Sequence, residues 1–139
     1  MKNIKNKPTY KEKLKAERLY KKKLIKKGNQ LFKEVCFKLY GNKCELTGGN
    51  YRLSVHHYYP RGLYGYLVYE PLNGIVLAFP PHFAHHHRGD PRIHEQIRAK
   101  RGEKWWSALQ EKVQDKPHQG YKTTQWLEEQ IAKLKKILE

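Results

Sequence analysis

Histidine is concentrated in one short part of the chain. Six of the eight histidines fall between positions 56 and 87, as an adjacent pair followed by a group of four. Imidazole binds metal ions and transfers protons near neutral pH, so a cluster of this kind indicates metal-assisted or acid–base chemistry. Any one of these residues alone would be read as a surface or packing residue. The six are His56, His57, His82, His85, His86 and His87.

Their spacing suggests how they would be divided between tasks. His82 and His86 are four residues apart, so on a helix of residues 82–87 their rings share one face and can bind one ion. His56 and His57 are adjacent on an expected strand and therefore point to opposite faces. One of the pair can bind the metal while its neighbour meets a substrate or a water molecule.

Two strands and a loop are expected to position the histidines. Residues 51–59 partly alternate and favour β-formers, and residues 74–79 form a compact apolar run that Pro80 stops. The segment between them is rich in glycine and proline. We therefore expect a hairpin whose first strand carries the histidine pair.

The rest of the pattern is helical, with apolar residues three or four apart. Thr9 and Glu12 have the spacing of a capping box, and Gly28 is expected to end the first, lysine-rich helix. Trp105 and Trp106 are expected to pack in the core rather than stack on bases. The expected helices cover residues 10–27, 30–40, a segment from residue 91 onward, and residues 124–138.

The order of these motifs resembles the HNH endonucleases, also called the ββα-metal or His-Me finger group. The resemblance lies in VHHYYP (55–60), EPLNGIVL (70–77) and the closing HxxxH, and it covers about residues 41–90. It is closest to the double-histidine version found in DNase-type colicins and small phage HNH proteins. It implies an α+β fold with a hairpin–helix core, flanking helices and a basic helical arm.

The resemblance also implies roles for individual residues. His57 would be the general base that activates water, and Asn73 would brace the loop that presents it. His56, His82 and His86 would hold a single divalent cation. The implied reaction is hydrolysis of a DNA phosphodiester to 5′-phosphate and 3′-hydroxyl ends, for which a neutral imidazole and a metal ion are suitable catalysts.

The identity of the metal stays open. The histidine ligands favour Zn, Ni, Co or Mn, although phosphate and water oxygens could still admit Mg. Many HNH proteins also carry two CxxC pairs that bind a structural zinc. Here Cys44 stands where the first pair would begin, but Thr47, Ala78 and Pro81 occupy the other three positions. No structural zinc is therefore expected.

The charge distribution points to a polyanionic partner. The net charge is +16, and residues 1–43 contribute +12 of it, with 15 Lys and Arg against three Glu. We expect nucleic acid rather than an acidic membrane surface. The resemblance to HNH endonucleases implies that this nucleic acid is DNA, with double-stranded DNA as the expected partner. Arg61 follows the histidine pair and could clamp a phosphate or be an ordinary surface residue. The lysines expected to grip phosphates are Lys21, Lys22, Lys23, Lys26 and Lys27.

Other classes of protein fit less well. The longest apolar run is too short to cross a membrane, and the two cysteines cannot form a disulfide framework, so an intracellular protein is expected. The expected domains are an arm (1–29), a nuclease domain (30–114) and a C-terminal helix (115–139). That last helix would either dock on the core or pair two subunits, which leaves a monomer or a homodimer.

Two alternatives to a nuclease remain. One is a non-catalytic nucleic-acid-binding protein whose histidines hold a structural metal. The other is a basic protein that binds RNA within a ribonucleoprotein and needs no metal.

Overall fold

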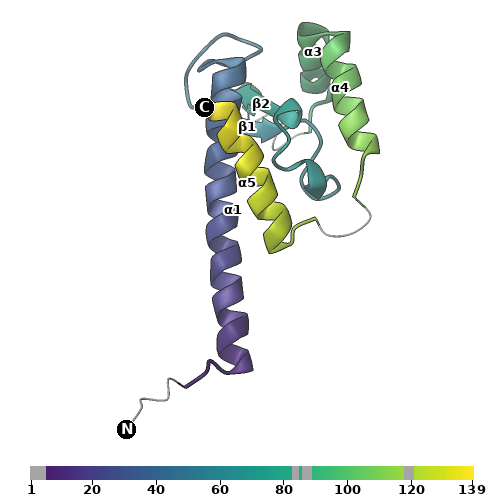
Figure 1. Cartoon of the computed structure of the whole chain (residues 1–139). Helices are drawn as coiled ribbons and strands as arrows, with labels where there is room; N and C mark the ends of the chain where they lie inside the picture. The colour runs from purple at the N-terminus through teal and green to yellow at the C-terminus, as the bar shows by residue number, and fades with distance from the viewer. Residues whose placement is uncertain (1–5, 83–84, 86–88, 118–120) are drawn as a thin grey trace.

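The computed structural model describes residues 6–82, 85, 89–117 and 121–139. The described part of the chain is α+β, as expected, with four helices and one two-stranded sheet (Figure 1). None of its helices combines the length and the apolar character needed to span a membrane. The elements are α1 (Tyr10–Tyr40), β1 (Ser54–His57), the 3₁₀ helices η1 (Gly65–Leu67) and η2 (Pro71–Asn73), β2 (Gly74–Leu77), α3 (Pro91–Arg101), α4 (Glu103–Gln114) and α5 (Thr124–Leu138).

Helix α1 is one continuous element of 31 residues. The expected capping box is confirmed, because the Thr9 hydroxyl accepts from the Glu12 amide and the Glu12 carboxylate accepts from the Thr9 amide. The expectation that Gly28 ends a first helix is wrong. Gly28 is buried in mid-helix, where a Cβ atom would lie 2.8 Å from Cζ of Tyr69. The glycine serves close packing, and the helix ends only at Gly41, whose φ is +89°.

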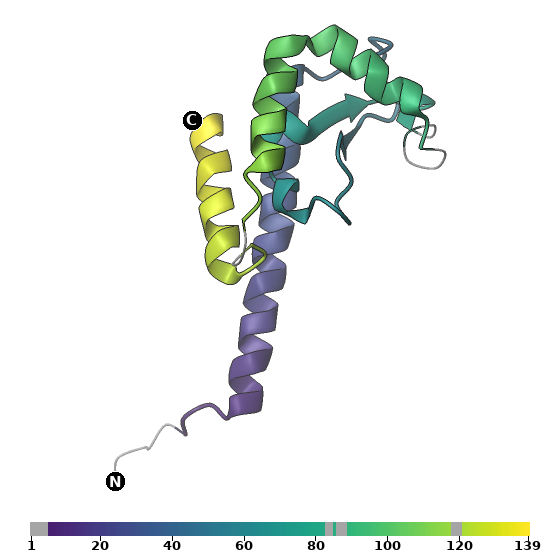
Figure 2. The same cartoon turned by 90° about the vertical axis from the view of Figure 1, so that its right-hand side faces the viewer.

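The expected hairpin is confirmed, although each strand has only four residues. β1 and β2 pair antiparallel, with His56 opposite Ile75 and His57 opposite Gly74. The sheet lies between α1 on one side and α3 with α4 on the other (Figures 1 and 2). The ladder stops after His57 because the chain beyond it bonds to Asn73 instead.

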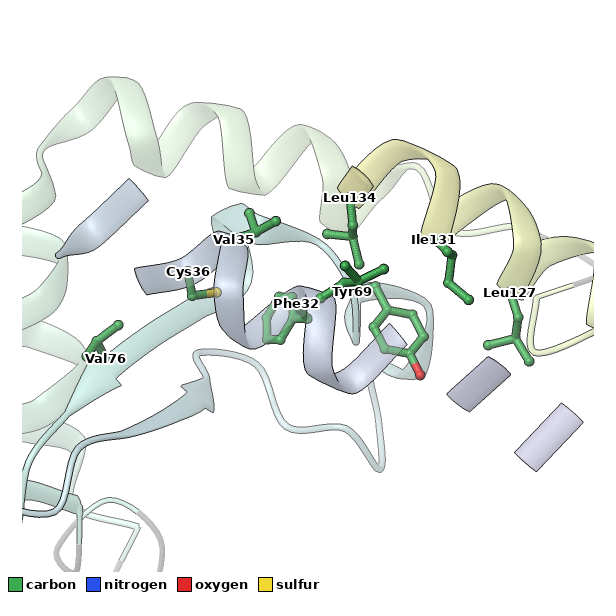
Figure 3. Close-up of a cluster of buried hydrophobic side chains, with 9 residues drawn as sticks. Phe32, Val35, Cys36, Tyr69, Val76, Leu127, Ile131 and Leu134 are labelled. Atoms are coloured by element: carbon green, nitrogen blue, oxygen red, sulfur yellow. The ribbon is translucent and has the colours of Figure 1, made fainter. Parts of the chain in front are cut away.

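The first of two hydrophobic clusters joins α1 to α5 (Figure 3). α5 runs in the same direction as α1, since Tyr20 donates to Glu128 near one end and Lys38 donates to the Ile137 carbonyl near the other. The apolar stripe of α5 is thereby buried within the chain itself. The boundary expected between residues 29 and 30 falls inside α1. The main buried residues of the first hydrophobic cluster are Leu31, Phe32, Val35, Tyr69, Val76, Leu127, Ile131 and Leu134.

The second cluster lies on the opposite face of the sheet. Ile75 and Leu77 of β2 pack there against Ile97 of α3 and Leu109 of α4. Trp105 belongs to this cluster, which confirms its expected role in the core. Both faces of the hairpin are therefore packed, with β2 fully buried and β1 half-buried, which is how four-residue strands can be held in place.

A buried ion pair ties these parts together. The Arg101 guanidinium donates to both carboxylate oxygens of Glu45, at 2.8 and 2.6 Å, and each side chain is only 7% exposed. Glu45 also accepts from the Val76 amide, and Arg101 donates to the Gly74 carbonyl. The Arg101 guanidinium lies 3.7 Å from the centroid of the Tyr40 ring. One pair thus contacts α1, β2 and the end of α3.

We predict that Glu45→Gln lowers the free energy of unfolding by about 3–5 kcal/mol, because it leaves the Arg101 charge buried without its partner. The same substitution at the exposed pair formed by Arg98 and Glu103, Glu103→Gln, should cost about 0–1 kcal/mol. Urea denaturation of both variants measures the difference. Equal losses would show that the buried pair is not a structural anchor.

Candidate active site

His57 is held on the α1 side of the sheet. Its ring stacks on Phe32 of α1, with centroids 5.0 Å apart and ring planes 1° apart. Its Nε2 atom lies 2.8 Å from the Val68 carbonyl oxygen. A carbonyl only accepts, so Nε2 carries the proton and donates, and Nδ1 keeps its lone pair. The ring is therefore fixed in the tautomer that can accept a proton at Nδ1.

The surroundings of His57 also favour its neutral form. Burial lowers the pKa of His57 below its usual value. The hydrogen bond to Val68 opposes this shift, while the positive charge of Arg61 lowers the pKa of His57 further. An imidazole that is neutral at physiological pH can serve as a general base.

His56 and His82 come together from separate elements. Nε2 of His56 lies 2.5 Å from Nδ1 of His82, and the Ser54 hydroxyl oxygen lies 2.7 and 2.8 Å from these two nitrogens. Ser54 and His56 share a face of β1 because they are two residues apart. His82 follows β2 and has helical conformation. Two imidazole nitrogens from separate elements thus face one another beside the Ser54 hydroxyl, and both belong to side chains that can bind a metal ion.

The third expected ligand cannot be placed. His86 lies outside the described residues, as do His87 and most of the expected helix of residues 82–87. Among the residues that are described, no three His, Cys, Asp or Glu side chains form a group that could hold a metal ion. Of the three expected metal ligands, the described residues therefore include His56 of β1 and His82, the first histidine of the HxxxH pair.

Two further histidines reach the site: His85, to which the resemblance assigned no role, and His94, which lies outside the histidine cluster in sequence. Nε2 of His85 lies 3.2 Å from the His57 carbonyl oxygen, and Nε2 of His94 lies 2.7 Å from the Tyr58 carbonyl oxygen. The rings of His85 and His94 are 5.0 Å apart. His94 belongs to α3, beyond the histidine cluster in sequence, so nothing in its spacing marks it as a neighbour of the hairpin.

Asn73 is fully buried and holds the loop that follows β1. Its Oδ1 accepts from the Tyr59 amide at 2.8 Å, and its Nδ2 donates to the carbonyl oxygens of Tyr59 and Leu67 at 3.2 and 3.3 Å. Both ends of the loop are thus fixed by one amide side chain. Val68, which orients His57, follows directly after this loop.

The histidines open into a basic cleft. A cavity of about 500 Å³ is lined by His56, His57, Arg61 and His94, among others. A neighbouring cavity of about 270 Å³ lies between α1 and β1, where Lys33 and Arg61 contribute positive charge. Arg61 is exposed, in a turn closed by a hydrogen bond from the Tyr64 amide to the Pro60 carbonyl. The cleft therefore combines imidazoles with cations that suit a phosphate.

The five lysines expected to bind phosphates lie on α1, N-terminal to the residues of that helix that border the cleft. Lys22, Lys23, Lys26 and Lys27 are exposed, whereas Lys21 is half-buried and shares a cavity with Arg61. These lysines therefore lie where α5 begins to pack on α1, and the N-terminal part of α1 extends beyond them, past the start of α5 (Figure 2).

Both cysteines are buried free thiols. Burial raises the pKa of Cys36 to about 12. Burial also acts to raise the pKa of Cys44, but hydrogen bonds with Thr47, Ala78 and Leu46 lower it overall. Thr47 and Ala78, where no cysteine stands, thus hydrogen-bond to the Cys44 thiol.

Comparisons of the chain with protein-family models, with curated protein sequences and with solved structures find no match. What the site does must therefore be inferred from its own residues and their geometry.

We predict that Asn73→Asp lowers the free energy of unfolding by about 1–3 kcal/mol or more, because a buried carboxylate would face the Tyr59 and Leu67 carbonyls that now accept hydrogen bonds. Asn50→Asp, at an exposed position, should change it by less than about 0.5 kcal/mol. Chemical denaturation of both variants tests this. A small loss at Asn73 would mean that the loop does not depend on its amide.

Proposed function

We propose that the chain is a metal-dependent DNA endonuclease of the HNH type, built on a ββα-metal core. The observation that carries the proposal is that His57, a neutral imidazole whose Nε2 donates to Val68, lines one cleft together with Arg61 and with His56, which also contacts His82. A proton acceptor, candidate metal ligands and a phosphate-binding charge are what phosphodiester hydrolysis requires.

His56 and His82 would hold the divalent cation, with His86 as the expected third ligand outside the described residues. The donor set fits such an ion, since two imidazole nitrogens from β1 and the following segment face one another. When bound, the ion would stabilise the charge on the phosphate and on the departing 3′ oxygen. Nitrogen ligands favour Zn, Ni, Co or Mn, and Mg stays possible through oxygen ligands of the substrate.

His57 would take the proton of the attacking water at Nδ1. The Val68 carbonyl holds the opposite nitrogen and favours the imidazolium that results. The stacked Phe32 ring keeps the imidazole from rotating. The water oxygen then bonds to phosphorus while the bond to the 3′ oxygen breaks, and that oxygen takes a proton from solvent, which gives 5′-phosphate and 3′-hydroxyl ends. Arg61, on the cleft wall, would bind a nonbridging phosphate oxygen.

Asn73 would act by positioning. Its bonds to Tyr59 and Leu67 fix the loop between the histidine pair and Val68. The distance from His57 to its orienting carbonyl depends on that loop. Loss of the amide would therefore reduce the rate through the geometry of His57 rather than through contact with DNA.

A plasmid-nicking assay tests the proposed nuclease activity and the separate roles of His57 as general base and His82 as metal ligand. After chelation, the purified chain is incubated with supercoiled DNA and Mg, Mn, Ni, Co or Zn in turn. We predict that His57→Ala keeps stoichiometric metal binding but loses about 10²- to 10⁴-fold in cleavage rate, because general-base assistance is gone. His82→Ala should instead lose the metal. The two variants control for each other, since both remove one imidazole.

Two outcomes would contradict this mechanism. Cleavage by His57→Ala within a few-fold of the wild-type rate would exclude His57 as the base. DNA binding without cleavage under every metal would overturn the enzyme and favour a non-catalytic binding protein.

We predict that the arm contributes through counterion release. Replacing Lys26 and Lys27 with Gln should reduce the slope of log K against log salt by up to about 1.8, since each phosphate contact contributes about 0.9. Lys135→Gln with Lys136→Gln removes the same charge from α5 and should leave the slope nearly unchanged. Equal effects of the two double substitutions would show that the DNA does not follow α1.

A further inference from the structure

A third cavity, which we call the α1–α5 pocket, lies between α1, η1 and α5. It has a volume of about 270 Å³ and a lining of aromatic and aliphatic side chains that includes Tyr69 and Trp126. Lys21, Arg61 and Lys122 also line it. Of the described residues in this lining, three carry positive charge and none carries negative charge. The pocket is therefore complementary to a small, flat, apolar group joined to an anion.

The α1–α5 pocket adjoins the candidate active site. Arg61 lines both this pocket and the cleft that contains His57. Val68 links them a second time, because its carbonyl orients His57 while the residue also lines the pocket. A strand in the cleft needs only to pass Arg61 to reach the pocket.

Lys122 is held at this pocket in an unusual conformation. Its φ of +69° lies in the left-handed region, which is unfavourable for a residue with a side chain. The end of its side chain lies across Gly65, where a Cβ atom would come within 2.6 Å of Cε and 2.7 Å of Nζ. Gly65 thus leaves the space that the Lys122 ammonium occupies. Strained backbone that places a charge beside a cavity is typical of binding sites.

We propose that the α1–α5 pocket binds one unpaired nucleotide of the DNA strand that passes through the cleft. Its base would lie against Trp126 and Tyr69, and its phosphates would contact Lys21, Arg61 and Lys122. The volume matches a single nucleotide, being below the usual range for larger ligands of about 300–1,000 Å³. This inference rests on the proposed function. The two helices that line the pocket, α1 and α5, lie outside the region that resembles HNH proteins.

The pocket would select the class of DNA that is bound. A base enclosed between two helices cannot remain stacked and paired in a duplex, so it must be unpaired beforehand or be extruded at a cost. Aromatic side chains bind any base by stacking, without reading sequence. The preferred substrate would therefore be DNA with an extrahelical or single-stranded nucleotide beside the cleavage position, rather than a fully paired duplex.

Binding of labelled oligonucleotides by the full chain tests the inference without divalent metal, so that cleavage plays no part. Three duplexes are compared by fluorescence anisotropy: one with an extrahelical thymidine, one with an abasic residue at that position, and one fully paired. We predict that the extrahelical thymidine binds at least about tenfold more tightly than the abasic residue. Trp126→Leu should bring this ratio near one.

Lys122→Gly is the second variant, because glycine accepts the positive φ and the fold should not suffer. It should weaken binding of the extrahelical duplex several-fold more than binding of the paired duplex. Lys135→Ala, which removes the same charge elsewhere, should weaken both equally. A wild-type ratio near one, or a ratio that both pocket variants leave unchanged, would overturn the inference. Plasmid nicking tests the proposed nuclease activity separately. Nicking without a preference for the extrahelical thymidine would overturn only this inference. The preference without nicking would overturn only the proposed nuclease activity.

Discussion

The ion pair between Arg101 and Glu45 is the constraint on which the rest of the structure depends. Two charges that are each 7% exposed must satisfy one another, because unpaired charge is very costly in a protein interior. The pair satisfies them bidentately and also engages the backbone of β2 at Gly74 and Val76. It therefore fixes where α3 ends and where β2 lies, and β2 in turn fixes the register of the strand that carries His56 and His57.

Close packing of α1 on the sheet is the second constraint. Gly74 lies opposite His57 in the ladder, and a Cβ atom at Gly74 would overlap the sulfur of Cys36 and lie 3.1 Å from Cζ of Phe32. The glycine lets α1 approach until Phe32 stacks on the His57 ring. A small residue on one strand thus determines how a histidine on the other is held, and the burial that lowers the pKa of His57 follows from the same contact.

Local patterns in the sequence predicted the hairpin, the Thr9 cap and the core position of Trp105, because each depends on neighbours in sequence. They failed where a tertiary contact decides. Gly28 resembles a helix end, but it lies in mid-helix against Tyr69, a residue far along the chain. Nothing in the sequence pairs Glu45 with Arg101, because the two are far apart along the chain and charged residues usually lie at the surface. The approach of His94 to Tyr58 likewise depends on how α3 folds back onto the hairpin.

The continuity of α1 changes what the uneven charge means. With a break at Gly28, the lysine-rich arm and the hairpin would be separate structural units. The positive charge of the arm could then be removed without affecting the candidate site. In one rigid helix, Lys26 and Lys27 are joined to Phe32 by less than two turns. Phosphates bound along the exposed half of α1 would thus be placed at a fixed distance from the ring that packs on His57. The helix would then align the DNA with the histidines as well as attract it.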